Sequence, residues 1–271
     1  MSDPDETWLL NTRYIGRKVL HFSSLESTND LALELAQDPR HEGTVILTDQ
    51  QTKGRGQYGR VWQAPSGSSL LMSILLFPPP RLRRPVLLTA LAAVAVSETI
   101  FQFAGLQTKI KWPNDLLLEG KKVSGILIEC GSKGNASPYV VMGMGVNLNQ
   151  SADDFSQLGL PDATSLAIAT GKEQSLTPIS RLLIHQLDLE YDRLLSESSD
   201  ALESQWKTRL GLLGEEILVE FHDGRQVKGR LRELAFDGIL LESSSGNLER
   251  IEPEVIRHLR GVPNWVAAVL L

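Results

Sequence analysis

A glycine-rich basic segment at residues 53–62 constrains this chain more than any other feature. It reads Lys-Gly-Arg-Gly-Gln-Tyr-Gly-Arg-Val-Trp, with three glycines among three cations and no acid. Glycine lets the backbone bend sharply and approach a ligand closely. Exposed N–H groups beside guanidinium groups form anion sites, most often for phosphate. The segment therefore predicts an anion-binding loop, and the plain alternative is a surface loop that is basic by chance.

Three familiar nucleotide-binding motifs do not fit this loop. The Gly-x-Gly-x-x-Gly spacing of residues 54–59 matches a dinucleotide-binding fingerprint, which requires a helix at its last glycine. Pro65 and Gly67 follow too soon for that helix. A protein kinase would also carry Val-Ala-Ile-Lys, His-Arg-Asp and Asp-Phe-Gly, none of which occurs. A P-loop needs Lys-Ser or Lys-Thr at residues 60–61, where Arg-Val stands.

The composition bounds the kind of protein. The chain has 271 residues, 42% of them hydrophobic and 22% charged, which suits one large globular domain and a smaller one. A net charge of −6 is wrong for a protein that coats nucleic acid. Cys130 is the only cysteine, which excludes an intrachain disulfide and favours a reducing, cytoplasmic compartment. Because Cys130 ends an apolar run, we expect it in the core.

No membrane attachment is predicted. The first residues are polar and acidic, unlike a signal peptide. The longest apolar stretch, residues 86–106, is interrupted by Ser97, Glu98 and Gln102. These polar side chains favour a buried helix over a membrane span.

Helical and strand-like segments alternate in the larger, N-terminal part of the chain. One helix is expected from Ser27 to about Gln37, opened by Ser27 and Asp30 as a capping box. A second, apolar helix is expected over residues 86–104. Strand-like runs occupy residues 44–48, 70–77, 110–112, 116–118, 123–130 and 139–147.

The pattern changes after Leu213 and Gly214. Short strand-like runs follow at residues 217–221, 226–234, 238–242 and 248–251, separated by turn sequences such as His-Asp-Gly. Close, evenly spaced strands of this kind predict a small barrel. We therefore expect a domain boundary at residues 211–214.

Three further segments bring polar groups to the ends of strand-like runs. Residues 111–115 read Lys-Trp-Pro-Asn-Asp, residues 121–125 read Lys-Lys-Val-Ser-Gly, and residues 143–147 read Gly-Met-Gly-Val-Asn. Each has a plain alternative as a solvated turn, a β-bulge or a loop cap. Their occurrence together, in one order, favours a shared binding site.

These segments closely resemble those of the biotin protein ligases. The resemblance rests on Ser27-Thr28-Asn29, Gln51, residues 54–62, residues 111–115, Lys122 with Gly125-Ile126, and residues 143–147, and it covers about residues 20–260. It implies an α+β fold, in which a mixed-sheet catalytic domain of the biotin/lipoate-ligase type (residues 1–212) precedes a small SH3-like barrel (residues 213–271). It also implies a reaction in two steps. Biotin and ATP form biotinyl-5′-AMP, and a lysine of a biotin carboxyl carrier protein, of the acetyl-CoA carboxylase type, then accepts the biotin.

The resemblance implies roles for residues of these segments. Ser27, Thr28 and Gln51 would bind the ureido ring of biotin, and Arg55, Arg60 and Lys122 would act as catalytic cations. Asp115 would help to hold Mg²⁺. The implied biotin site consists of Ser27, Thr28, Asn29, Gln51, Gly54, Arg55, Gly56, Gln57, Lys122, Gly125 and Gly143. The implied ATP site consists of Arg60, Trp62, Lys111, Asn114 and Asn147, with Trp62 and Asn147 on the adenine side.

The sequence departs from the family pattern in two places, which affect the expected phosphate contacts and the expected partners. Gln57 stands where many relatives carry arginine, which removes one cation from the loop. The segment before Ser27 is too short for the DNA-binding helix-turn-helix of some relatives, so we expect no DNA partner. A homodimer is left open, and no residue is assigned as the base for the second step.

Two other functions remain as alternatives. A lipoate or octanoate ligase or transferase shares the catalytic architecture, and a biotin-sensing module would bind biotin without catalysis. The glycine loop, residues 111–115 and the C-terminal strands favour the biotin ligase over both.

Overall fold

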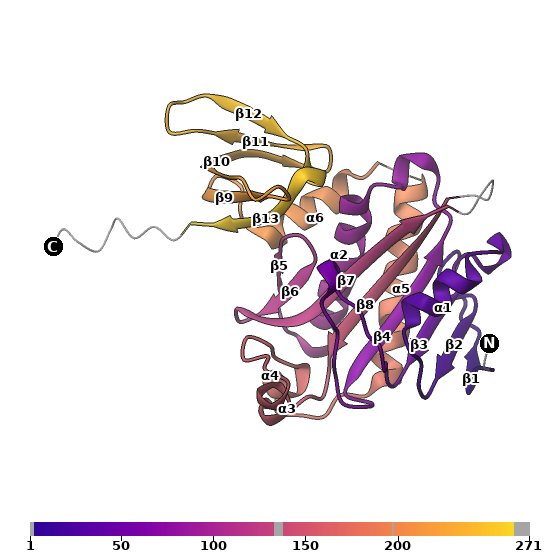
Figure 1. Cartoon of the computed structure of the whole chain (residues 1–271). Coiled ribbons are helices and arrows are strands. Elements are labelled where there is room, and N and C mark those ends of the chain that lie inside the picture. The colour runs from indigo at the N-terminus through magenta and orange to yellow at the C-terminus, as the bar shows by residue number, and fades with distance from the viewer. Residues whose placement is uncertain (1–2, 133–137, 197, 263–271) are drawn as a thin grey trace.

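A computed structural model describes residues 3–132, 138–196 and 198–262. In this part of the chain, eight strands form one sheet in the order β1-β2-β3-β4-β8-β7-β6-β5 (Figure 1). β2 and β3 are parallel and the other neighbours are antiparallel, which confirms the predicted mixed sheet. The strands are β1 (Glu6–Trp8), β2 (Val19–Phe22), β3 (Val45–Thr48), β4 (Ser69–Leu76), β5 (Lys109–Lys111), β6 (Asp115–Leu118), β7 (Lys121–Gly131) and β8 (Tyr139–Asn147).

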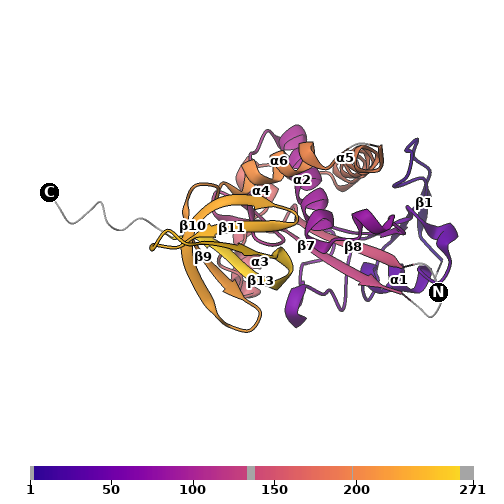
Figure 2. The same ribbon diagram turned by 90° about the horizontal axis from the view of Figure 1, so that it is seen from above.

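Helices cover both faces of this sheet. The long helices α2 (Pro85–Ala104) and α5 (Leu176–Ser196) lie on one face, and α1 (Thr28–Leu35) lies on the other, as Figure 2 shows from above. The remaining helices are α3 (Ala152–Gln157), α4 (Leu166–Thr170) and α6 (Asp200–Leu210). α2 is long and apolar enough to cross a membrane, but 72% of that apolar window is buried inside the protein. It is the buried helix that its polar interruptions predicted.

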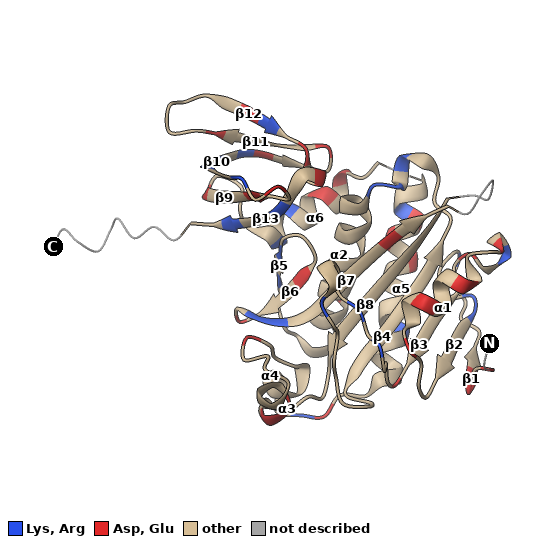
Figure 3. Ribbon diagram, viewed as in Figure 1, with Lys and Arg blue, Asp and Glu red and all other residues tan. Residues whose placement is uncertain are grey.

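Strand alternation decides which residues build the core and which face the site. On β4, Leu70, Met72 and Ile74 belong to the core cluster that includes α2 and α5, whereas Leu75 packs with α1. Successive side chains of a strand point to opposite faces. β4 and β8 contain no charged residue, so both strands are tan along their length in Figure 3. The α1 face is only partly covered by that helix, and the uncovered part carries small and polar residues.

Five antiparallel strands form the second sheet, in the order β12-β11-β10-β9-β13. They are β9 (Glu216–Phe221), β10 (Gln226–Ala235), β11 (Gly238–Glu242), β12 (Leu248–Ile251) and β13 (Ile256–Gly261). Four of the five match the predicted runs within about two residues. The sheet is compatible with the SH3-like barrel that the sequence predicted.

An aromatic cluster joins the second sheet to the first. Trp206 on α6 packs between Trp112 and Phe236, with ring centroids 5.9 Å and 5.0 Å away. Trp112 Nε1 also donates a hydrogen bond of 3.4 Å to Ile256 O on β13. Since Trp112 lies in the Lys-Trp-Pro-Asn-Asp segment, this cluster fixes one of the predicted site segments against the C-terminal sheet.

One sequence-based expectation about a single residue is wrong, and three strands were missed. Cys130 is exposed, not buried in the core. Burial along β7 falls from Ile126, which is 2% exposed, toward the partly covered C-terminal end of this long strand. Strands β1, β2 and β13 were not predicted, because short strands without a clear alternating pattern give little sequence signal.

Candidate active site

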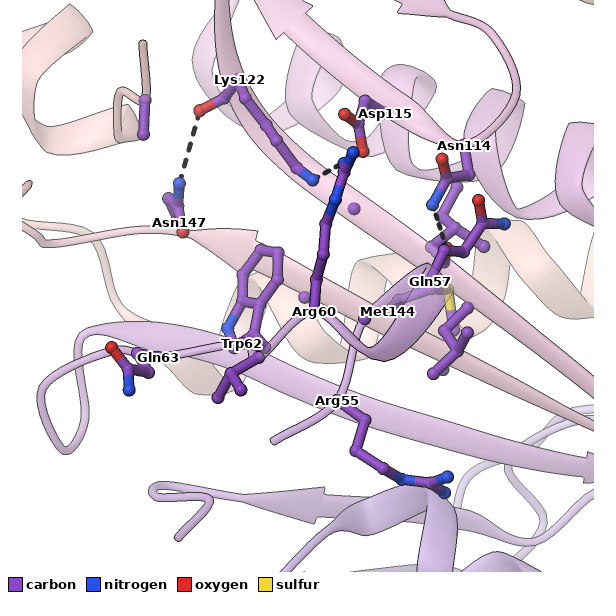
Figure 4. A pocket seen from close by; sticks show the side chains of 18 of the residues that line it. Arg55, Gln57, Arg60, Trp62, Gln63, Asn114, Asp115, Lys122, Met144 and Asn147 are labelled. Carbon is purple, nitrogen blue, oxygen red and sulfur yellow. Dashed lines mark hydrogen bonds and ion pairs between the residues drawn. The ribbon is translucent and has the colours of Figure 1, made fainter. Parts of the chain in front are cut away.

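A cavity of about 520 Å³ lies on the sheet face that carries α1 (Figure 4). Every predicted site residue except Gly54 lines it. Gly54 lines a second, more open cavity of about 820 Å³, which shares residues 55–57 and 60–61 of the glycine loop with the first. The structure therefore gathers segments from six separate parts of the sequence around one space.

Strand register builds the floor of this cavity from small residues. Gly143 on β8 lies opposite Ser73 on β4 and Leu127 on β7. Gly145 lies opposite Gly125 on β7. A Cβ atom at Gly143 would overlap the side-chain amide of Asn29, and one at Gly145 would overlap the ring of Trp62. Glycine is needed at both positions because other groups approach the strand backbone closely.

A polar cluster at the start of α1 forms one end of the cavity. Thr28 donates to Gln51 Oε1 from its backbone N at 2.8 Å and from Oγ1 at 3.1 Å. Ser73 Oγ lies 2.7 Å from Thr28 Oγ1 and 2.5 Å from Asn29 Oδ1. Ser27, Thr28 and Asn29 are all buried. The cluster supplies donors and acceptors in an otherwise apolar wall.

The predicted capping box at Ser27 is wrong. The Ser27 side chain makes no capping hydrogen bond. Gln51 instead satisfies the first-turn N–H of Thr28, one of the donors that every helix leaves unpaired at its start. Asp30 is engaged elsewhere, because Arg55 Nη2 lies 2.6 Å from its Oδ1.

The glycine loop folds as a hairpin over the cavity. Gly56 N donates to Arg60 O at 2.7 Å, and Trp62 N donates to Gly54 O at 3.0 Å. Its tip is a short 3-10 turn, Gln57–Gly59, in which Tyr58 has a left-handed φ of 58°. The Tyr58 ring lies 5.9 Å from His222 and 5.3 Å from the Arg257 guanidinium of the C-terminal sheet.

A β-bulge turns Lys122 toward the cavity. Leu116 and Leu117 on β6 pair with Ser124 and Lys122, so that Val123 on β7 is skipped. Val123 is fully buried. Without the bulge, Lys122 and Gly125 would point to opposite faces of the sheet, since they are three residues apart. With it, both line the cavity, and Lys122 Nζ lies 5.8 Å from the Trp62 ring centre.

Two of the three predicted catalytic cations are paired with carboxylates. Lys122 Nζ lies 2.6 Å from Asp115 Oδ1. Arg55 makes a bidentate contact with Glu129, at 3.0 Å for each oxygen, in addition to its contact with Asp30. Arg55 therefore points away from Lys122 (Figure 4) and does not lie beside it. Arg60 forms no ion pair with any residue that the structure describes.

The residues predicted for the nucleotide end all line the cavity. Asn147 donates from Nδ2 to Thr164 O at 3.0 Å, and Asn114 donates from Nδ2 to Ile126 O at 2.6 Å. Both amides thus hold backbone segments that line the cavity. Trp62 Nε1 is buried and has no partner among the described residues. A buried donor of this kind needs an acceptor, which a ligand can supply.

Sequence reasoning missed two kinds of site residue. Ser73 and Glu129 contact Asn29 and Arg55, but their only sequence signal is a polar residue inside an apolar strand. Phe155 on α3 and residues 159–163 also line the cavity. Their sequence carries no motif that points to it.

The candidate metal ligands are carboxylates on the cavity wall. The structure brings together no group of three or more His, Cys, Asp or Glu side chains among its described residues. Asp115 lines the cavity beside Lys122. One carboxylate is enough where Mg²⁺ is held mainly by phosphate oxygens and water, so the side chain present fits such an ion.

Comparisons with known proteins agree with this geometry. The model of the biotin/lipoate A/B protein ligase family matches residues 21–147. The chain is 32% identical over 251 residues to the bifunctional ligase/repressor BirA of Bacillus spizizenii, covering 93% of this chain and 77% of that protein. It is 28% identical to the biotin–[acetyl-CoA-carboxylase] ligase of Mycobacterium tuberculosis, covering 86% of each.

A solved structure agrees as well. The biotin protein ligase of Aquifex aeolicus, in complex with biotin and ATP, superposes with a TM-score of 0.74 at 25% identity, covering 90% of this chain and 99% of that one. The chain therefore belongs to the biotin/lipoate A/B protein ligase family, on its biotin protein ligase branch.

Proposed function

We propose that this enzyme activates biotin with ATP to form biotinyl-5′-AMP and transfers the biotin to a lysine of a biotin carboxyl carrier protein. The single observation that carries the proposal is the cavity itself. It has a buried polar cluster at one end, a glycine floor in the middle and three cations, Arg60, Lys111 and Lys122, at the other end. Biotin and the adenylate phosphate need these environments in this order.

The polar cluster suits the ureido ring. Gln51, Thr28 and Ser73 offer both donors and acceptors, as a ring with two N–H groups and one carbonyl requires. The floor beyond them, with Gly143 and Leu127, leaves room for an apolar ring and chain. Biotin in this pose would direct its carboxylate toward Lys122.

The cations suit the adenylation step. A biotin carboxylate that attacks the α-phosphate of ATP brings two anions together, and their repulsion must be offset. Lys122 and Arg60 line the cavity where this would occur, and Arg55 lies at the base of the same loop. The carboxylate is already a nucleophile, so this step needs no general base.

The nucleotide end has matching features. An acceptor on the ligand would satisfy the buried Nε1 of Trp62. Asp115 would hold the Mg²⁺ that accompanies ATP, and a bound Mg²⁺ would neutralise phosphate charge during adenylation. Phe155, Asn114, Lys111 and Asn147 also line the cavity. ATP would thus fit this end of the cavity by shape and by charge, largely through residues of the sequence motifs.

The proposal extends to the acceptor, the setting and the domains. The acceptor lysine would belong to a carrier of the acetyl-CoA carboxylase type, because the name of the similar ligase from Mycobacterium tuberculosis includes that enzyme. The single cysteine and the carboxylase acceptor both suit the cytoplasm. The catalytic domain would occupy residues 1–212 and the C-terminal domain residues 213–271, since α6 ends at Leu210 and β9 begins at Glu216.

A panel of acids tests the proposal against its nearest rival. The protein is incubated with Mg-ATP and biotin, lipoate or octanoate, and pyrophosphate release is measured. Release that depends on biotin supports the proposal. Release that depends on lipoate or octanoate instead would make the protein a lipoate-type ligase, and binding of biotin without release would make it a biotin-sensing module.

A further inference from the structure

Glu129 on β7 contacts both the biotin end of the cavity and the glycine loop. Its Oε2 accepts a hydrogen bond of 2.6 Å from Asn29 Nδ2, while its two oxygens accept from Arg55 at 3.0 Å each. We propose that Glu129 is a positioning residue, which couples closure of the glycine loop to occupation of the biotin end. The proposal rests on the function proposed above and adds a residue to its machinery.

The alternation of side chains along β7 places Glu129 on the face that this role requires. Gly125, Leu127 and Glu129 share one face of the strand, which is the face that lines the two cavities. A carboxylate can only accept hydrogen bonds. It therefore fixes which way the Asn29 amide is turned, with Nδ2 toward Glu129 and Oδ1 toward Ser73. Asn29 is 5% exposed, so water does not offer a ready substitute for either contact.

Arg55 is the partner of Glu129 in the loop. A bidentate contact of guanidinium with carboxylate fixes direction as well as distance. It joins the first arm of the loop hairpin to the central sheet, because β7 pairs with β8 from Ser124 to Gly131. Arg55 also pairs with Asp30 on α1, at 2.6 Å. The remaining ion pair of the loop among the described residues joins Lys53 to Glu26, and these side chains are 67% and 66% exposed. Exposed pairs of that kind contribute little.

One carboxylate thus serves two groups that would otherwise act independently. A ligand that moves Asn29 changes how Glu129 is held, and Glu129 in turn holds Arg55. Loss of the carboxylate should loosen the loop and, through Asn29, weaken the biotin end. Glu26 offers a comparison, because its carboxylate also pairs with a cation of the glycine loop, Lys53, but makes no contact with Asn29 or Arg55.

Three variants separate these contacts. Glu129→Gln keeps an oxygen for Asn29 but cannot accept both donors of Arg55. Glu129→Ala removes both contacts. Glu26→Gln is the control, since it removes a carboxylate from the other loop pair and touches neither Asn29 nor Arg55. Limited trypsin digestion after Arg55 and Arg60 in the unliganded protein measures the loop, and titration calorimetry with biotin measures the biotin end.

Both Glu129 variants should be cut about fivefold faster than the wild type, as expected for loss of a well-aligned, partly exposed ion pair. Glu129→Ala should also bind biotin about tenfold more weakly, whereas Glu129→Gln should bind it nearly normally. Glu26→Gln should match the wild type in both measurements. Equal cutting and equal biotin affinity in all four proteins would overturn the proposal.

A double-mutant cycle tests whether Glu129 acts through Arg55. The measured quantity is the release rate of labelled biotinyl-AMP from the wild type, Glu129→Gln, Arg55→Gln and the double variant. If Glu129 acts through Arg55, Glu129→Gln should have no further effect once Arg55 is replaced. Additive effects would contradict the coupling. A wild type that forms no biotinyl-AMP would instead contradict the proposed function, while the trypsin result would still report on Glu129.

Discussion

Lys122 Nζ lies 2.6 Å from Asp115 Oδ1, so a carboxylate from the adjacent strand β6 already neutralises the central cation of the cavity. The Asp115 side chain is 15% exposed and the Lys122 side chain 36% exposed. A pair that is this accessible can open toward an arriving anion at modest cost. Asp115 therefore holds Lys122 in the cavity in the absence of ligand, and the ligand phosphate or carboxylate would compete for the same ammonium group.

The neighbouring lysines 121 and 122 give a matched test of this placement. Lys121 is exposed at the end of β7, whereas Lys122 lines the cavity. Lys122→Ala should slow adenylation roughly a hundredfold to a thousandfold, as expected when a transition-state anion loses about 2.7–4 kcal/mol of stabilisation. Lys121→Ala should leave the rate near that of the wild type. Biotin-dependent pyrophosphate exchange measures both, and equal rates for the two variants would refute the assignment of Lys122.

Asp115 is expected to act on the metal as well as on Lys122. In Asp115→Asn the side chain keeps its shape but loses its charge, so the Mg²⁺ concentration needed for half-maximal adenylation should rise several-fold. The measurement is a Mg²⁺ titration of pyrophosphate exchange at saturating biotin. A lower rate with an unchanged Mg²⁺ dependence would show that Asp115 serves only to position Lys122.

Local sequence patterns predicted much of the fold. Long apolar or alternating runs became β4, β7, β8 and α2 with small errors at their ends. The motifs placed their residues in one cavity because each motif stands at a strand end or a loop that meets the same sheet face. Gly143 and Gly145 belong to the Gly-Met-Gly-Val-Asn segment, and the structure gives the reason for glycine there, since Asn29 and Trp62 lie directly over these two positions.

The pairing between distant residues could not be predicted in the same way. Arg55 was predicted as a catalytic cation of the biotin site, but its contact with Glu129 depends on the register of β7 and on the position of the loop above it. Lys122 faces the cavity only because of a β-bulge at Val123, and the local sequence around Val123 does not predict a bulge. Gln51, and not the side chain of Ser27, accepts the hydrogen bond from the first-turn N–H of α1, because the fold brings Gln51 to the start of that helix. The Arg55 and Gln51 contacts join residues more than 20 positions apart in the sequence, and the bulge depends on the register of β7 against β6.

Gln57 gives a prediction about retention of the intermediate. It lines both cavities and begins the turn at the tip of the glycine loop. Glutamine brings no charge, and charge-assisted hydrogen bonds are about twice as strong as neutral ones. Gln57→Arg should therefore lengthen the lifetime of bound biotinyl-AMP with little change in biotin affinity. A pulse-chase with labelled adenylate checks this, and identical release rates would show that the side chain does not reach the phosphate.

His258 on β13 predicts how stability depends on pH. Burial lowers its pKa below the ordinary value of 6.5, and the nearby cations Arg257, Arg60 and Lys111 act in the same direction, while Glu220 opposes them. The unfolded chain then binds more protons than the folded one below pH 6.5, so this residue makes the free energy of unfolding fall as the pH falls. Urea unfolding at about pH 7.5 and about pH 5.5 should show a smaller loss for His258→Gln than for the wild type. An equal loss in both proteins would contradict the assignment.

The mass of a carrier domain tests the central claim most directly. The protein is incubated with biotin, Mg-ATP and the biotin carboxyl carrier domain of an acetyl-CoA carboxylase, and the carrier is weighed intact. The account predicts an increase of one biotinyl group, which requires ATP and is absent when the acceptor lysine is replaced by arginine. A carrier whose mass stays unchanged under conditions in which an established biotin protein ligase modifies it would contradict the account.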